Sequence, residues 1–225
     1  MTVLPGRTLK LQRLGLLKTN DEIPRELDHN IWVAEQPLKY FGLSVGTRMT
    51  IIRLENNELV VISPIQPSSS MLNQLSKLGT VQHIISPNLY HYLFAAEFKQ
   101  HYPDATFWAT PGLDTKKPDL LIDRVIEGDT NSLWHGLECL PFSGFRTLSL
   151  NGFDSLNEWV CFHQASKTLI LTDAAFHFDE SFPMATQLIT RVIGGYKRLS
   201  PSILEKIATT DKEKIKTSVE QILTW

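Results

Sequence analysis

The stretch from Val81 to Phe98 constrains the fold more than any other part of the sequence. Residues 81–85 form a short apolar run typical of a strand, a Ser-Pro-Asn turn follows at once, and apolar residues then recur at helical spacing. A strand that passes through a polar turn into a helix is characteristic of α/β proteins, which often carry chemistry in such loops. His91 lies in this junction and is therefore the first candidate for a functional residue.

Chain length and composition limit the architecture and the classes of partner. The 225 residues suffice for one α/β domain, so we expect an N-terminal extension over residues 1–30 and one domain over residues 31–225. Hydrophobic residues make up 42% and charged residues 20%, as in an ordinary globular protein. A net charge of −2 gives no electrostatic footprint for nucleic acid or an anionic membrane, so neither is expected as a partner.

The N-terminal residues and the cysteines predict where the chain resides and how its thiols behave. Basic residues interrupt the apolar positions of residues 1–17, which leaves no hydrophobic segment of signal-peptide or membrane-spanning length and predicts a cytoplasmic protein. Cys139 and Cys161 both lie in apolar, strand-like runs. We therefore expect two buried free thiols rather than a disulfide framework or a zinc site.

The order of expected elements is mixed, with strands and helices alternating in the first half and helices ending the chain. Turn and capping signals separate the elements. In the first half we expect a strand at 31–36, a hairpin at 48–65 turning at Asn56-Asn57, a helix at 69–78, a strand at 81–85, a helix through 98 and a strand at 105–109. In the middle we expect strands at 120–126 and 133–142 around a polar turn at 128–131, and then a hairpin that pairs 158–162 with 168–172. The last expected elements are three helices: one at 182–193, one that starts at Ser200-Pro201, and one that starts with a capping box of Thr210 and Glu213.

This order is compatible with a four-layer αββα sandwich, an α/β (α+β) class of fold. The segments RMTIIRLENNELVVISPI, SPNLYHYLF and EWVCFHQASKTLILTDAAF resemble an uncharacterised family whose fold is similar to that of the metallo-β-lactamase superfamily. The resemblance extends over residues 31–225. It implies a further strand with a last histidine ligand after Trp225, so the domain is expected to lack its final strand.

The resemblance also implies which positions would carry metal ligands. Active members hold two metal ions with His-x-His-x-Asp-His at the junction, a later His, an Asp that closes a hairpin, and a last His. At the junction these positions fall on Ser86, Asn88, Tyr90 and His91, of which only His91 matches. The later His falls on Asp154, a substitute ligand, and the closing Asp falls on Asp173, a match.

Each candidate residue also has an ordinary structural explanation. His91 at a helix start can be satisfied by backbone or water, and Asp173 after an apolar strand can cap the next turn. In the register of the second hairpin Glu158 falls opposite Asp173 and near Asp154, where clustered carboxylates would bind a cation or keep one member protonated. His177 reaches the same place only if residues 173–177 are helical, and otherwise is an exposed loop residue.

Two functions remain open from the sequence, and neither identifies catalytic residues. The first is a metallo-β-lactamase-like protein with a degenerate dinuclear site that binds a small molecule or a protein without metal, in a pocket formed by Asn88, Tyr90, Glu158 and His177. The alternative is a hydrolase of an ester, amide or thioester with one divalent metal, zinc, manganese or iron, on His91, Asp154 and Asp173.

Overall fold

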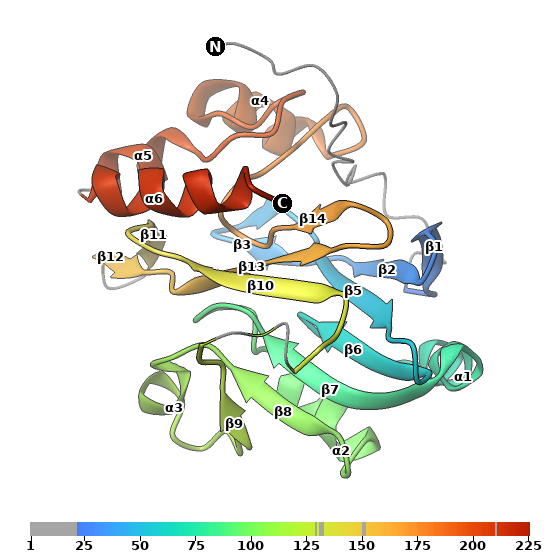
Figure 1. Cartoon of the computed structure of the whole chain (residues 1–225). Coiled ribbons are helices and arrows are strands. Elements are labelled where there is room, and N and C mark those ends of the chain that lie inside the picture. The colour runs from blue at the N-terminus through green and yellow to red at the C-terminus, as the bar shows by residue number, and fades with distance from the viewer. Residues whose placement is uncertain (1–21, 129, 131–132, 150–151, 210) are drawn as a thin grey trace.

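Two β-sheets face each other, and helices cover the outer face of each sheet (Figure 1). The computed structural model describes residues 22–225 except 129, 131–132, 150–151 and 210. The large sheet has the order β1 (Arg25–Asp28), β2 (Ile31–Gln36), β5 (Thr47–Arg53), β6 (Glu58–Ile62), β7 (Thr80–Ser86), β8 (Thr106–Ala109) and β9 (Arg124–Val125). Strands β6 to β9 are parallel, whereas β1, β2, β5 and β6 pair antiparallel.

The second sheet is antiparallel and smaller. It consists of β10 (Leu137–Phe142), β13 (Glu158–His163) and β14 (Thr168–Ile170), with β13 in the middle. Two short hairpins accompany the sheets: β3 (Lys39–Tyr40) with β4 (Leu43–Ser44), and β11 (Arg146–Ser149) with β12 (Gly152–Ser155). The helices are α1 (Ser69–Leu78), α2 (Ala95–His101), α3 (Leu113–Lys116), α4 (Met184–Ile193), α5 (Ile203–Ala208) and α6 (Lys212–Ile222).

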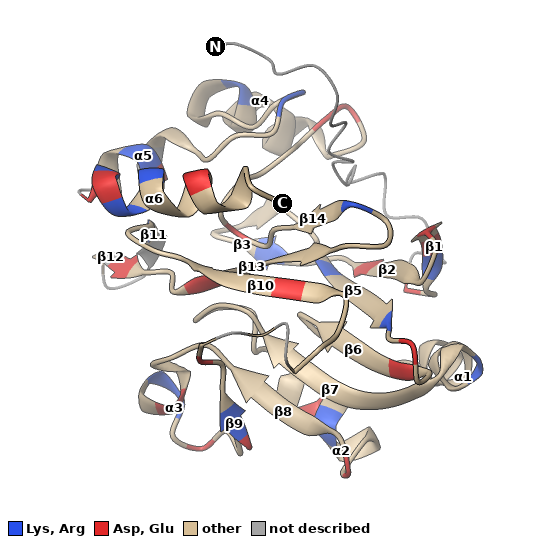
Figure 2. Cartoon of the chain, in the orientation of Figure 1, with Lys and Arg blue, Asp and Glu red and all other residues tan. Residues whose placement is uncertain are grey.

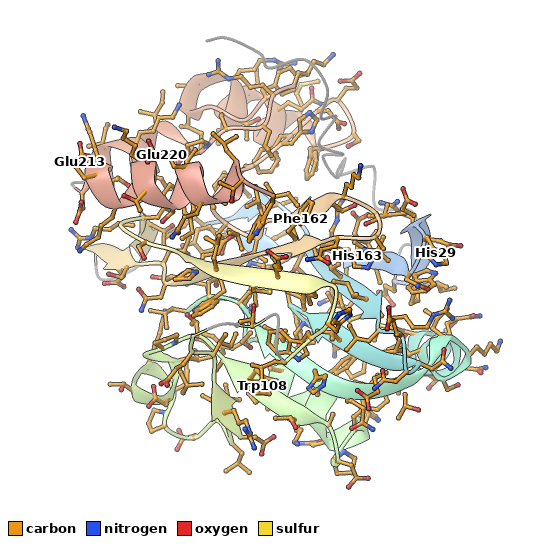
Figure 3. All side chains as sticks on the ribbon, in the orientation of Figure 1. His29, Trp108, Phe162, His163, Glu213 and Glu220 are labelled. Atoms are coloured by element: carbon orange, nitrogen blue, oxygen red, sulfur yellow. A yellow bond between two sulfur atoms is a disulfide. The ribbon has the colours of Figure 1, made fainter. Side chains whose placement is uncertain are left out.

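Alternating side chains of the large sheet fill two separate cores. One set packs against α1 and α2, and includes Ile51, Val61 and Phe107. The alternate set packs against the second sheet and includes Trp108, labelled in Figure 3. Trp108 also meets Trp134, just before β10, edge-on with ring centroids 5.2 Å apart. A two-residue period of this kind is what a strand covered on both faces requires.

A third core lies between the second sheet and α6. Phe142 and Val160 of the sheet pack with Ile215 and Ile222 of the helix, and Trp225 stacks on Phe162 with ring centroids 5.5 Å apart. Three cores between four layers agree with the expected αββα arrangement. Among the described residues no helix is long and apolar enough to cross a membrane.

Three expectations about local structure are wrong. The strands expected around residues 128–131 form no hairpin, because β9 joins β8 in the large sheet whereas β10 belongs to the second sheet. Of that expected turn, residues 129 and 131 lie outside the described residues. The last helix is capped by Asp211, whose side chain accepts from the Lys214 amide at 3.2 Å, and Thr210 lies outside the described residues.

The third correction concerns Cys139 and Cys161, which form a disulfide instead of remaining free thiols. The antiparallel register of β10 and β13 places the two residues directly opposite each other, with Cα atoms 4.0 Å apart. Neither cysteine-containing run reveals this pairing by itself, because the register depends on the whole sheet. The bridge closes a loop that contains the β11–β12 hairpin.

We expect this bridge to stabilise the fold against unfolding. For a sequence separation of 22 residues, loop-closure entropy predicts a contribution of about 3 kcal/mol. Replacing both Cys139 and Cys161 by alanine should lower the free energy of unfolding in urea by about that amount. A reducing agent should bring the native chain to the same stability and leave the double variant unchanged. A native chain that is insensitive to reductant would contradict the assignment.

Candidate functional site

Polar side chains meet where β6 and β7 end and where β13 begins. Parallel strands place their carboxyl ends at one edge, and that edge of an α/β sheet is where ligands usually bind. Ser63 follows β6, Asn88 and His91 follow β7, and Asp173 follows β14. Glu158 is the first residue of β13 and completes the cluster, which we call the junction site.

Asn88 organises the junction site from the turn after β7. Its side chain is fully buried. Its Oδ1 accepts hydrogen bonds from the backbone amides of Tyr90, at 2.8 Å, and His91, at 3.0 Å. Its Nδ2 donates to Oγ1 of Thr172 at 3.0 Å and to Oδ2 of Asp173 at 2.9 Å. An asparagine has four such positions, so Asn88 ties the loop after β7 to the end of β14 with all of them.

His91 is held at both ring nitrogens. Its Nδ1 forms a short hydrogen bond with Oγ of Ser63, and its Nε2 lies 3.2 Å from Oδ2 of Asp173. Burial alone would lower the pKa of His91, but the Asp173 carboxylate outweighs burial and raises that pKa above its usual value. The same contact, with the Asn88 amide, lowers the pKa of Asp173 although burial opposes it. Both shifts favour the charged forms, so the contact has the character of an ion pair.

Glu158 holds the backbone of the segment that carries Asp173. Its carboxylate is fully buried and accepts from the backbone amides of Thr172 and Asp173, each at 2.8 Å. Burial and the neighbouring Asp173 charge raise the pKa of Glu158 to about 7, and the two amide donors offset only part of that increase. Near neutral pH Glu158 is consequently divided between its protonated and ionised forms.

A second buried glutamate approaches the site from α5. Glu205 completes a capping box with Ser202: its Oε2 accepts a hydrogen bond from the backbone amide of Ser202 at 2.8 Å. Burial raises the pKa of Glu205 to about 7. The charges of Asp173 and Glu158 also raise that pKa. Tyr40, on the β3–β4 hairpin, has a raised pKa through burial and through the charges of Asp173 and Glu205. The hairpin and α5 therefore adjoin the junction site.

Asp154 and Tyr90 form a separate contact. The Tyr90 hydroxyl donates to Oδ2 of Asp154 at 3.3 Å, and Nζ of Lys116 lies 3.5 Å from the centroid of the Tyr90 ring. Burial lowers the pKa of Lys116, and the Asp154 charge opposes that shift. Asp154 thus accepts a hydrogen bond from Tyr90 and interacts electrostatically with Lys116, which in turn lies over the Tyr90 ring.

Neither His177, expected as a pocket residue, nor Ser86, at the first position of the resembled ligand motif, has a side-chain hydrogen bond at the junction site within the described chain. Residues 176 and 178 form isolated bridges with 200 and 196, so the segment after Asp173 is extended rather than helical, and the condition for His177 to turn back is not met. Its Nδ1 is buried without a hydrogen-bond partner among the described residues. Ser86, at the first junction position, is fully buried, and its Oγ likewise has no partner there.

The donor set does not fit a metal centre of the superfamily kind. Within the described part of the chain, no group of three or more His, Cys, Asp or Glu side chains has positions that could hold a metal ion. His91 and Asp173 supply two donors, whereas a catalytic zinc site normally has three protein ligands. A protonated imidazole also offers no lone pair to a metal.

The sequence interpretation missed Ser63 and Glu205. Ser63 directly follows β6, which runs parallel to β7, so its position beside the end of β7 and near His91 could have been inferred from strand order. It adopts a left-handed conformation, with φ of 56°, which is uncommon for a serine and typical of functional or tightly constrained positions. Glu205 carried no signal of its own, because α5 is separated from the other site residues along the chain.

Comparisons with known proteins agree with this fold. Residues 28–220 match the model of a family described as "Domain of unknown function (DUF4336)". A search of curated proteins finds no match.

Solved structures similar to this chain include metallo-β-lactamases. The DIM-1 metallo-β-lactamase has a TM-score of 0.54 and 12% identity, over 87% of this chain and 96% of that one. The metallo-β-lactamase IND-7 has a TM-score of 0.52 and 10% identity, over 71% and 74%. TMB-1 has a TM-score of 0.55 and 13% identity, over 91% of this chain and all of that one. The expected metallo-β-lactamase fold is confirmed, and at these identities the likeness concerns the fold alone.

The glutamate on α5 yields a prediction for the pH dependence of stability. Because the folded-state pKa of Glu205 is raised from 4.5 to about 7, the folded protein keeps a proton that the unfolded chain has lost. Stability therefore falls as the pH rises from about 4.5 through 7, by on the order of 3 kcal/mol for a shift of this size. Glu205→Gln retains the capping oxygen and should flatten this fall in urea denaturation.

An exposed glutamate provides the matched control for this measurement. Glu97→Gln, on the surface of α2, should reproduce the pH profile of the native chain. If the profiles of Glu205→Gln and the native chain coincide, Glu205 is not a proton-binding member of the site.

Proposed function

Because this chain belongs to the family described as Domain of unknown function (DUF4336), and has a metallo-β-lactamase fold, we propose that it is a binding protein with a degenerate metal site. In this proposal side chains occupy the position that metal ions take in active members of the superfamily. The protein then acts by binding a small molecule or a protein partner at the junction site, not by metal-dependent hydrolysis.

The observation that carries this proposal is the ion pair of His91 and Asp173. Their Nε2 and Oδ2 atoms lie 3.2 Å apart, Asn88 donates to the same Oδ2, and Ser63 bonds the other nitrogen of His91. A metal ligand needs a deprotonated donor with a free lone pair. The raised pKa of His91 favours the protonated imidazole, and the Asp173 contact engages the same atoms that a metal would need.

The chemistry of a ligand follows from the exposure and charge of the site. The side chains of His91 and Asp173 are 19% and 23% exposed, so a small molecule can reach them. Glu158 and Glu205, both with pKa values of about 7, make the surroundings acidic when they ionise. This combination favours a small ligand that presents a positively charged or hydrogen-bond-donating group.

Nucleic acid is not a partner in this proposal. Basic and acidic residues are mixed over the strands and helices in view (Figure 2), and no continuous basic stripe is visible on that side of the described residues. Recognition of nucleic acid depends on such a basic face.

One distance favours the second candidate, a hydrolase of an ester, amide or thioester with a mononuclear site. Ligand atoms bound at about 2.0 Å around a tetrahedral zinc lie roughly 3.3 Å apart. The 3.2 Å between the His91 and Asp173 atoms equals that separation within its precision. This candidate requires a third ligand, for which Asp154 would have to leave Tyr90.

Metal analysis of the full chain tests both candidates. Protein purified without chelator and then dialysed against zinc or manganese should contain no stoichiometric metal, because the His91 proton and the Asp173 contact must first be displaced. The metal content is measured by mass spectrometry, and the melting temperature should not rise when either metal is added.

A variant pair makes this experiment specific to the junction site. One metal per chain that is lost in His91→Ala but retained in His101→Ala, a histidine exposed on α2, would overturn the binding-protein proposal and favour the hydrolase. Any metal bound equally by both variants lies elsewhere on the surface.

The cellular compartment is a separate proposal. The N-terminal residues predict a cytoplasmic protein, whereas disulfides such as Cys139–Cys161 are rare in reducing compartments. The redox state of these two cysteines in cells distinguishes the cytoplasm from an oxidising compartment.

A further inference from the structure

Helix α4 exposes its apolar side chains and buries polar ones. Met184, Leu188 and Val192 are 75%, 57% and 74% exposed, and their spacing of four residues places them on one side of the helix. The side that faces the protein carries Thr186 and Thr190, which are both buried. A surface helix of a globular protein normally has the opposite arrangement.

Helix α5 has the same reversed arrangement. Ile203 and Ile207 are 45% and 69% exposed, while Glu205, two residues from each of them, is buried. At about 100° per residue, a separation of two residues places Glu205 on the opposite side of the helix from both isoleucines. The apolar side of α5 therefore faces away from the junction site.

The two helices adjoin through their connecting loop. A Cβ built on Gly194, directly after α4, would lie 3.8 Å from Cα of Ser202, directly before α5. We define the α4–α5 face as the five most exposed large apolar residues of the two helices: Met184, Leu188, Val192, Ile203 and Ile207. Exposed apolar patches of this kind mark interaction sites.

The exposed charged residues on the two helices and on the segment between them are basic. Between residues 182 and 209 the chain carries Arg191, Lys197, Arg198 and Lys206, and the one acidic residue in that range is the buried Glu205. Lys197 pairs with Glu180 at 2.9 Å. The segment 182–209 therefore carries Arg191, Arg198 and Lys206 besides this pair, although the whole chain has a net charge of −2 and Asp179 and Asp211 flank the segment.

From this juxtaposition we propose that the α4–α5 face docks on the surface of an anionic lipid bilayer. The exposed apolar side chains enter the boundary between headgroups and acyl chains, and Arg191, Arg198 and Lys206 face the lipid phosphates. The low net charge of the whole chain predicted no membrane partner, because a sum over all residues does not show the positive charge of the segment 182–209. The proposal is independent of the function assigned to the junction site.

Charge complementarity favours a bilayer over two other possible occupants. In a two-fold dimer through this face, the basic residues of one copy would lie near those of the other. The N-terminal residues 1–21 carry Arg7, Lys10, Arg13 and Lys18 against a single acid, Asp21, so their charge has the same sign as the face. An anionic lipid surface complements it.

Vesicle sedimentation with the full chain tests this proposal. The native chain should sediment with vesicles of phosphatidylcholine mixed with phosphatidylglycerol and remain in the supernatant with phosphatidylcholine alone. The double variant Leu188→Glu/Val192→Glu should bind the mixed vesicles at least about tenfold more weakly than the native chain, because it removes two side chains that enter the bilayer. Raising the salt concentration should also weaken native binding.

Matched variants and the oligomeric state complete the test. Leu121→Glu changes an equally apolar residue, 85% exposed but outside the face, and should bind like the native chain. If the double variant melts at a lower temperature, the single change Met184→Glu at an exposed position takes its place. The proposal is overturned by failure to bind the mixed vesicles, by equal binding to phosphatidylcholine, by undiminished binding of the face variants, or by a native dimer that these variants convert to monomers.

Discussion

The ion pair between His91 and Asp173 is the contact on which the arrangement of the junction site depends. It joins the loop after β7 of the large sheet to the residues that follow β14 of the second sheet, through atoms 3.2 Å apart. Partly buried pairs of this kind persist when their remaining hydrogen-bonding positions are satisfied. Ser63, Asn88 and Glu158 provide those partners, directly or through the backbone amide of Asp173.

Sequence periodicity predicted most of the fold because the large sheet is buried on both faces. The inner strands β5, β6 and β8 contain short apolar runs, and turn signals such as Asn57, with φ of 62°, separate such runs. The periodicity could not predict to which of the two sheets each strand belongs, or which neighbour it pairs with there. For that reason two features were missed: the crossing from β9 in one sheet to β10 in the other, and the disulfide that the register of β10 and β13 permits between Cys139 and Cys161.

The candidate site was predictable only where the sequence carries a local pattern. The strand-to-helix junction directed attention to His91 and Asn88, and the closing hairpin directed it to Asp173. Glu205 could not be found in that way, because it reaches the site from a helix far along the chain and is identified by its burial. The α4–α5 face was likewise hidden, since an amphipathic pattern does not reveal which side is covered.

The protonation state of His91 tests the central claim most directly. Nitrogen NMR of the imidazole at neutral pH should show both ring nitrogens protonated, with a pKa above that of an ordinary histidine, because Asp173 stabilises the charged form. In Asp173→Asn this pKa should fall, since burial is then opposed only by the weaker effect of the Glu158 charge. A neutral imidazole at pH 7 in the native chain, with an unprotonated Nε2 available to a metal, would contradict the account.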